Sequence, residues 1–486
     1  MSFKKIHSIA FLSCLIGGAF LRLYFIFTRD IFTDEVFYFN IARSSSWLDI
    51  IKMNHWIKDH PQLYILFLKL LSLFGQNIIG LRVSNVLIYI FCSYFLYQFF
   101  SKFKLYWVAL LSTFLFSFWT YFVYINCQLS PYNFALFFTC LSFFTFVKFK
   151  NDIKSTGNKA IFCFSMLLSA IFYSDYTSVY FYLTYIPIII YLWKNNIVKI
   201  GPILLILCLN FIFIFPGLIQ IKNNLSYFVG LNRASPKIMS LSLFETFQMV
   251  ANISFFRSEG KIVSAGCFIG LIMCLLFVIF RSRSKKKLRI LSGYGLYGLL
   301  ISFLIQYCLT KSFISVVVER TYWFHYLIMI IGIALIAEYL KKINNKILAV
   351  YLLLIIFLMI TRFKDNPNYR VSGRVPDQNI QYKTLFTRLK SSTRKFKQLV
   401  FIDKNNRYIP LSDYYFKDLC QRRCIRKTTL NETDINNITS SNNSVYILFN
   451  EDESEKNIAK KLAKSNLSQY FSIQCERLEC RFIQLN

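Results

Sequence analysis

Acidic residues are scarce in this chain of 486 residues, which has 24 Asp and Glu against 56 Lys and Arg and a net charge of +32. In a soluble protein such a positive excess indicates nucleic-acid binding. Here much of the excess lies in short Lys/Arg clusters between apolar runs, which is how membrane topology is encoded. We therefore exclude nucleic acid as a partner and interpret the clusters as topology signals.

The first three quarters of the chain lack the composition of a soluble domain. Apolar runs long enough to cross a bilayer recur from the N-terminus to about residue 362, and 55% of all residues are hydrophobic. This pattern is typical of a polytopic membrane protein. The first run, Ile6 to Phe27, lacks a small-residue cleavage site and contains Arg22, so we interpret it as a retained helix rather than a signal peptide.

The Lys/Arg clusters fix the predicted orientation. Placing all of them on the cytoplasmic side leaves room for two crossings in each interval, which predicts about 11 transmembrane helices, a cytoplasmic N-terminus and an extracytoplasmic tail. The predicted helices are 7–27, 81–100, 106–125, 133–147, 160–175, 177–193, 200–219, 263–280, 290–310, 322–339 and 347–362.

Two segments of the first outer loop are predicted to lie at the membrane interface. Pro61–Phe74 is apolar, but at 1.5 Å per residue it is only about 21 Å long, which is short of a roughly 30 Å hydrocarbon core. We expect this segment to form an interfacial helix with Lys69 snorkelling, and Val36–Trp47 to form another.

The tail is polar and rich in Asn, Lys and Ser. A helical pattern at Ser454–Ser465 accompanies strand-like runs, which together predict a small α/β domain. The expected fold is thus a polytopic α-helical membrane domain over 1–362 and an extracytoplasmic α/β domain over 363–486. The strand-like runs are Gln398–Ile402, Val445–Phe449 and Cys480–Leu485.

Cysteine usage differs between the two parts. Nine of the 13 cysteines lie in apolar runs, where cysteine is usually a small apolar residue. The pattern of the other four fits a zinc site, but in an exported domain two disulfides are the better interpretation, with their connectivity open. These four are Cys420, Cys424, Cys475 and Cys480.

Polar residues within or beside the apolar runs collect at the predicted outer face. Asp34 and Glu35 follow the first helix, and carboxylates at the mouth of a membrane helix are costly unless they are solvated, paired or used. A random scatter would leave some members at the inner face, so their joint placement indicates a site. The other members are Arg22, His60, Arg82, Gln128, Tyr132, Asp175, Glu319, Arg320 and His325.

Each of these residues also has a structural interpretation. Arg22 can snorkel or pair with Glu35, Arg82 can anchor a helix at the interface, and Asp175 can be a buried, paired carboxylate. Taken together, however, the residue types suit one chemistry. A carboxylate can deprotonate a nucleophile, while guanidinium groups bind a phosphate leaving group and stabilise its growing charge. With interfacial helices shaping a groove for a lipid tail, the donor would be a lipid-linked phosphate.

Several motifs resemble GT-C glycosyltransferases, in particular the dolichyl-phosphate-mannose protein mannosyltransferases, the lipid A aminoarabinose transferases and related bacterial polyprenyl-phosphate-sugar enzymes. The resemblance covers the membrane domain, is specific over residues 20–85 and is weak after about 135. The motifs are Phe20-Leu-Arg22, Thr33-Asp34-Glu35-Val-Phe-Tyr38, His60-Pro61-Gln62-Leu63 (with Gln62 replacing a second proline), Gly80-Leu81-Arg82, Gln128-Leu-Ser-Pro-Tyr132 and Arg320-Thr-Tyr322.

The resemblance implies roles for these residues. Asp34 would be the general base, Glu35 would position Arg22 or the acceptor, and Arg82 and Arg320 would contact the donor phosphate, with inversion at the anomeric carbon. The acceptor would be a glycolipid, a glycan or a protein. Gln128 stands where many relatives carry an acid or an arginine, which weakens a metal assignment. Some GT-C enzymes need a divalent cation, but those that use a lipid monophosphate sugar commonly do not, so we expect no essential metal and no cofactor.

Two other functions fit parts of the pattern. A transporter or flippase of a lipid-linked glycan would need polar residues throughout the depth of the bundle and often has broken helices. A scaffold that retained the fold without activity would not need Asp34, Glu35 and Arg82 together. The chain is rich in Lys, Asn, Ile and Phe, which suggests an AT-rich genome and favours a bacterial inner membrane.

Overall fold

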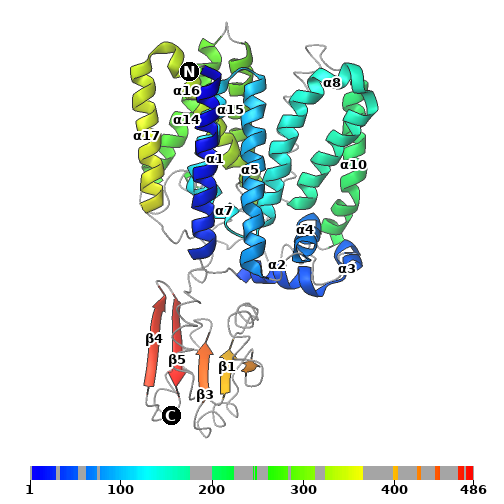
Figure 1. Ribbon diagram of the computed structural model, residues 1–486, viewed down its shortest axis with the longest axis vertical. Helices are drawn as coiled ribbons and strands as arrows, with labels where there is room; N and C mark the ends of the chain where they lie inside the picture. Colours follow the sequence, from blue (N-terminus) through cyan, green and yellow to red (C-terminus); the bar gives the residue numbers. More distant parts are fainter. Residues whose placement is uncertain are drawn as a thin grey trace. The chain divides into compact units, whose positions relative to one another are not determined.

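The computed structural model describes residues 3–28, 33–52, 62–73, 77–175, 200–223, 245, 247–248, 261–282, 286–311 and 323–364, together with five strands beyond residue 397. The chain divides into two compact units (Figure 1). Unit 1 comprises Met1–Phe27 and Ile41–Val371, and unit 2 comprises Thr28–Asn40 and Ser372–Asn486. Asp34 and Glu35 are thus grouped with the tail, whereas the predicted domain boundary leaves them in the membrane domain.

The described part of the chain is predominantly helical. Its longer helices are α1 (Phe3–Thr28), α5 (Ile78–Lys102), α6 (Tyr106–Phe118), α8 (Pro131–Ser174), α10 (Ile200–Asn223), α14 (Lys261–Arg281), α15 (Lys286–Lys311), α16 (Trp323–Ile343) and α17 (Asn345–Lys364). The shorter helices are α2 (Thr33–Ser44), α3 (Trp47–Lys52), α4 (Gln62–Ser72) and α7 (Thr120–Asn126).

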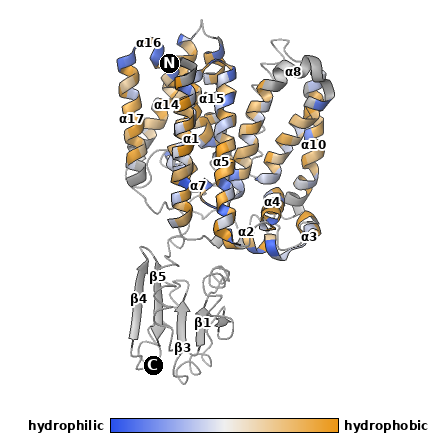
Figure 2. Ribbon diagram, in the orientation of Figure 1, coloured by the Kyte–Doolittle hydropathy of each residue, from blue (hydrophilic) through white to orange (hydrophobic). Residues whose placement is uncertain are grey.

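Three of these helices are long and apolar enough to cross a membrane: Ile6–Thr28, Ile78–Lys102 and Trp323–Ile343. A fourth candidate is the pair α6 and α7, which is bent by 60° at a break. Figure 2 shows apolar residues along most of the length of these helices, with hydrophilic residues gathered near the ends. Many large apolar side chains of α1 and α17, such as Phe20 and Val350, are exposed, as expected for contact with lipid.

The predicted helix positions compare closely with the described ones except at two places. The predicted 106–125 helix is broken into α6 and α7, and the predicted 133–147 and 160–175 helices fall within the single helix α8. The predicted 177–193 helix lies outside the described residues. Each of the other predicted crossings overlaps a helix over most of its length.

Helix α8 reverses its direction along its length. The rings of Phe146 and Phe164 are 6.4 Å apart, whereas a straight helix would separate residues at this spacing by about 27 Å. The chain therefore folds back between them, and the two apolar stretches Pro131–Val147 and Ile161–Ser174 run beside each other. A reversal here agrees with two predicted helices joined through a Lys-rich segment.

Helix α16 forms the centre of unit 1. Every side chain from Trp323 to Tyr339 is buried, and the helix contacts α6, α14, α15 and α17. A helix that is apolar on all sides is stable only when other helices surround it. Helix α5 packs against α6 and α8 but leaves one face, with Leu87 and Phe91, exposed.

Short helices occupy the part of the first loop where interfacial helices were predicted. Helix α4 has 11 residues, so it is about 17 Å long and does not reach across a bilayer. The ammonium of Lys69 on α4 donates to the carbonyl oxygens of Ala42 at 3.2 Å and Ser45 at 2.6 Å, and it lies over the Trp47 ring. Lys69 thus caps the C-terminal end of α2, where a cation also complements the helix dipole.

Five strands of unit 2 form one sheet in the order β2-β1-β3-β5-β4. Strand β1 is parallel to β2 and β3, and β5 is antiparallel to β3 and β4. The predicted strand runs coincide with β1, β3 and β5, which are the three inner strands. The edge strands β2 and β4 were not predicted. The strands are β1 (Gln398–Ile402), β2 (Cys424–Lys427), β3 (Ser444–Leu448), β4 (Gln469–Cys475) and β5 (Leu478–Gln484).

The strand order restricts the connectivity of the four tail cysteines. Cys424 is in β2, whereas Cys480 is in β5 and Cys475 in β4. Neighbouring strands lie about 4.8 Å apart, so β2 is about 14 Å from β5 and farther from β4. A disulfide needs Cα atoms within about 7 Å, which excludes any bridge from Cys424 to Cys475 or Cys480.

Replacing Lys69 with Met removes the two hydrogen bonds to the end of α2 and preserves most of the apolar stem. We expect a loss of about 1.5–3 kcal/mol of stability, because hydrogen bonds from a charged group are involved. Thermal unfolding of the purified protein in detergent measures this loss of stability. The matched control is Lys102→Met, at an exposed lysine. Equal melting temperatures for both variants would contradict the capping role.

Candidate functional site

The break between α6 and α7 is occupied by a side chain from α1. The last carbonyls of a helix have no partner within it, and two of those at the end of α6 accept hydrogen bonds from Arg22. Its Nη1 donates to Ser117 O at 2.8 Å and its Nη2 to Phe116 O at 3.1 Å. Insertion of a side chain into the hydrogen-bond ladder is a recognised cause of helix kinks.

The remaining donors of Arg22 are also used. Nη1 donates to Gly18 O at 3.0 Å, and Nε and Nη2 both donate to Asn126 Oδ1 at 3.1 and 3.0 Å. The guanidinium carbon lies 3.7 Å from the centre of the Tyr89 ring. Because a guanidinium has five N–H groups and five hydrogen bonds are made, contact between Arg22 and a phosphate would require the break to reorganise.

Tyr89 explains why the sequence has a glycine one turn before Arg22. A Cβ added to Gly18 would clash with the Tyr89 hydroxyl and lie 2.9 Å from Ser117 Cβ. The Tyr89 hydroxyl is held there by Ser117 Oγ at 2.7 Å and Cys14 O at 3.2 Å. Close contact of α1, α5 and α6 at this level therefore depends on glycine.

A chain of amide side chains continues from Arg22 to the turn between α7 and α8. Asn126 Nδ2 donates to Asn133 Oδ1 at 2.6 Å, and Asn133 Nδ2 donates to Gln128 O at 3.1 Å. Asn85 on α5 donates to the same carbonyl at 2.6 Å. Ser130 caps the start of α8 by accepting from the backbone N–H of the half-buried Tyr132. Of the two residues predicted here, Gln128 thus lies in a turn that buried amides hold in place, and Tyr132 lies in the first turn of α8.

Arg82 and Asn85 lie next to this turn on one face of α5, because residues three apart are neighbours on a helix. Arg82 is completely buried, and its Nη1 lies 3.4 Å from Ile26 O at the end of α1. Asn85 Oδ1 and Gln128 Nε2 are buried and have no hydrogen-bond partner among the residues that the structure describes. An unused acceptor and donor, close to a buried cation, suit a ligand with hydroxyl groups and a negative charge. We refer to Arg82, Asn85 and Gln128 as the Arg82 site.

Asp175 takes part in a different contact. It ends α8 and accepts a 2.7 Å hydrogen bond from Trp323 Nε1 at the start of α16. Two residues further along α16, His325 Nδ1 is 2.8 Å from Ser302 Oγ on α15, and its ring stacks on Phe268. All four polar partners are buried. These pairs tie α8, α15 and α16 together, and they agree with the structural interpretation of Asp175.

Other predicted residues are described only in part. Glu35 lies in the first turn of α2 and is 1% exposed. Asp34 shares that turn, but its side chain lies outside the described part, as do His60, Arg320 and Tyr322. Within the described ranges, no group of three or more His, Cys, Asp or Glu residues is arranged to hold a metal ion.

Sequence reasoning missed the residues that join the predicted ones. Asn85, Asn126 and Asn133 are amides in otherwise apolar segments, and that placement is a signal, but amides are common throughout this Asn-rich chain. Comparison with known proteins adds no name to the site: no protein-family model matches the chain, and a search of curated proteins found no match.

Arg22→Lys keeps the charge but cannot supply five N–H groups in one plane. We expect it to lower stability by about 3–5 kcal/mol, because buried carbonyls at the helix break lose their donors. Thermal unfolding in detergent measures this loss, with Arg281→Lys at the exposed end of α14 as the matched control. An Arg22→Lys melting temperature equal to that of the control would show that the five bonds do not hold the break.

Proposed function

We propose that this protein is a membrane glycosyltransferase that moves a sugar from a polyprenyl-phosphate donor to an acceptor on the outer face of the membrane. The observation that carries the proposal is the Arg82 site, where a buried guanidinium accompanies an unused amide acceptor and an unused amide donor. A sugar phosphate offers complementary groups: hydroxyls for the amides and a phosphate for the cation.

The proposed chemistry combines this site with the motif residues. Asp34 removes a proton from the acceptor nucleophile, which attacks the anomeric carbon from the face opposite the leaving polyprenyl phosphate. Arg82 stabilises the negative charge that grows on this phosphate. Glu35, Arg320, Tyr322, His60 and Tyr132 are proposed to position donor and acceptor, and no metal is required.

The proposed architecture includes more crossings than the described helices account for. It has about 11 crossings of the GT-C type, with α2, α3 and α4 at the outer interface and an extracytoplasmic α/β domain built on the five-stranded sheet. The Lys/Arg clusters between apolar runs support a cytoplasmic N-terminus. The composition supports a bacterial inner membrane.

One observation favours a transporter or flippase as a second candidate. Helix breaks within spans are typical of transporters, and α6 and α7 meet at a 60° bend. At this break, however, the freed carbonyls of Phe116 and Ser117 are occupied by Arg22. A transported solute would have to compete with a side chain that already satisfies these carbonyls. The break therefore does not favour a transporter over an enzyme.

Asp34→Asn is expected to abolish transfer, because a general base contributes about 100-fold or more to the rate. Mass spectrometry of glycolipids and surface glycans from cells with each form would show a sugar-sized mass that is present with wild type and missing in the variant. Asp49→Asn, at a carboxylate on α3, is the matched control. Full product in Asp34→Asn cells, with both proteins equally expressed, would eliminate Asp34 as the base.

Arg82→Ala is expected to weaken binding of the carrier phosphate by about thirtyfold or more, since truncating one partner of a buried charged pair costs at least about 2 kcal/mol. The measurement is the rise in melting temperature that undecaprenyl phosphate, but not undecaprenol, gives to the purified protein. Asp34→Asn and Arg281→Ala should retain the full rise. An unchanged rise in Arg82→Ala would remove this residue from the phosphate site.

A further inference from the structure

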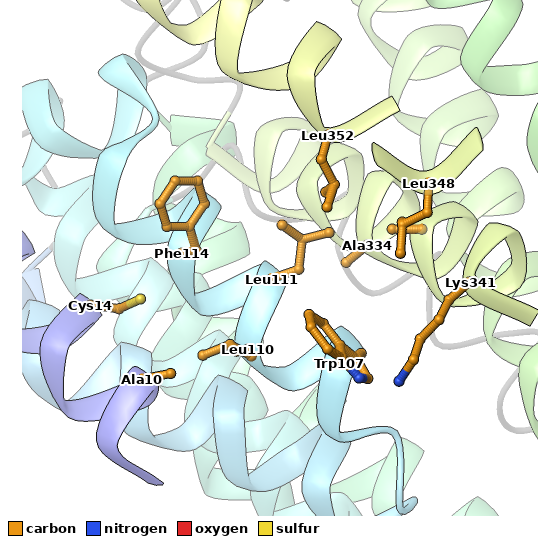
Figure 3. A pocket seen from close by; sticks show the side chains of 11 residues that line it. Ala10, Cys14, Trp107, Leu110, Leu111, Phe114, Ala334, Lys341, Leu348 and Leu352 are labelled. Carbon is orange, nitrogen blue, oxygen red and sulfur yellow. The ribbon is translucent and has the colours of Figure 1, made fainter. Parts of the chain in front are cut away.

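Unit 1 contains a cavity of about 180 Å³ between α1, α6, α16 and α17 that the proposed reaction does not use (Figure 3). Its walls include Ala10 on α1, Leu111 on α6, Ala334 on α16 and Leu352 on α17. Ala334 is buried, and the other three side chains are half-buried. The cavity is therefore a groove at the surface of the helix bundle. The alanines leave the space that larger side chains would fill.

The groove is not suited to water. A buried water needs two to four polar partners, and an apolar cavity of about 150 Å³ stays dry and takes up a hydrocarbon instead. The walls are apolar except for Cys14, Trp107 and Lys341. Helices α1 and α16, which form two of its walls, are candidate membrane spans, so the surrounding medium offers hydrocarbon chains.

One end of the groove is polar and positively charged. The Lys341 ammonium lies 4.5 Å from the centre of the Trp107 ring, and Figure 3 shows the two side chains next to each other at one side of the cavity. His7 packs edge-on against the same indole, with ring centres 5.6 Å apart. Trp and Lys at the end of a span are typical of the membrane–water interface.

We propose that this groove binds one anionic phospholipid, with an acyl chain between α6 and α17 and the phosphate at Lys341. Charge complementarity selects the occupant, because basic pockets between membrane helices recognise anionic head groups. A second copy of the chain would have to insert side chains into the groove and would not need an anion at Lys341. The groove lies at the end of the bundle where α1 begins and α16 ends, and the proposal is independent of the transferase function.

Native mass spectrometry tests the proposal. Purified full-length protein is incubated with mixed micelles of equal amounts of dioleoyl phosphatidylglycerol and dioleoyl phosphatidylcholine. We expect one phosphatidylglycerol to be retained in preference to phosphatidylcholine. Lys341→Gln should reduce this preference about fivefold, the effect of one basic residue at a lipid surface. Lys346→Gln, at an exposed lysine at the start of α17, is the matched control and should retain it.

Filling the groove separates the tail contact from the head-group contact. Ala10→Phe should abolish retention of both lipids, whereas Ser13→Phe, at an exposed position on the same helix, should behave as wild type. Leu348→Trp fills the groove from α17 if Ala10→Phe is not monodisperse. Equal retention of the two lipids by wild type, an unchanged preference in Lys341→Gln, or lipid-free dimers would overturn the proposal.

Discussion

The hydrogen bonds of Arg22 are the interaction on which the packing of α1, α5, α6 and α7 depends. A buried guanidinium is costly in an apolar interior unless its N–H groups have acceptors. The end of α6 supplies two carbonyls together with the negative end of a helix dipole, which also stabilises a cation. The same bonds satisfy buried carbonyls that would otherwise lack a donor at the break. Arginine and helix break therefore stabilise each other, and neither is tolerable alone.

This interaction gives Arg22 a structural role. Arg22 and Arg82 both lie within apolar helices and are both completely buried. All five N–H groups of Arg22 donate hydrogen bonds to protein acceptors. The amide chain through Asn126 and Asn133 then fixes the Gln128 turn on three helices. A site built on rigid, hydrogen-bonded elements holds its polar groups at defined positions, as transfer chemistry requires.

Two of the polar regions of unit 1 lie at opposite ends of α1. The Arg82 site lies at the end of α1, whereas Lys341 and Trp107 lie at the end where α1 begins. Helix α16 is buried along nearly its whole length. Charged groups near the ends of spans are the least costly, since they can reach the interface. The same rule explains why the sequence pattern alone located most of them.

Hydropathy and the Lys/Arg clusters by themselves determined where most helices of unit 1 begin and end, since the length of an apolar run sets the length of the span it can form. They also singled out Arg82, Gln128 and Tyr132. They did not predict the break at Trp119, because no Gly or Pro marks it in the sequence from Tyr106 to Asn126. Only the tertiary structure decided that the N–H groups of Arg22 are all used in hydrogen bonds and that Asn85 adjoins Gln128. The reason is physical: the acceptors of Arg22 at the break and on α7 come from residues 94 to 104 positions away in the chain, and no local pattern records such a pairing.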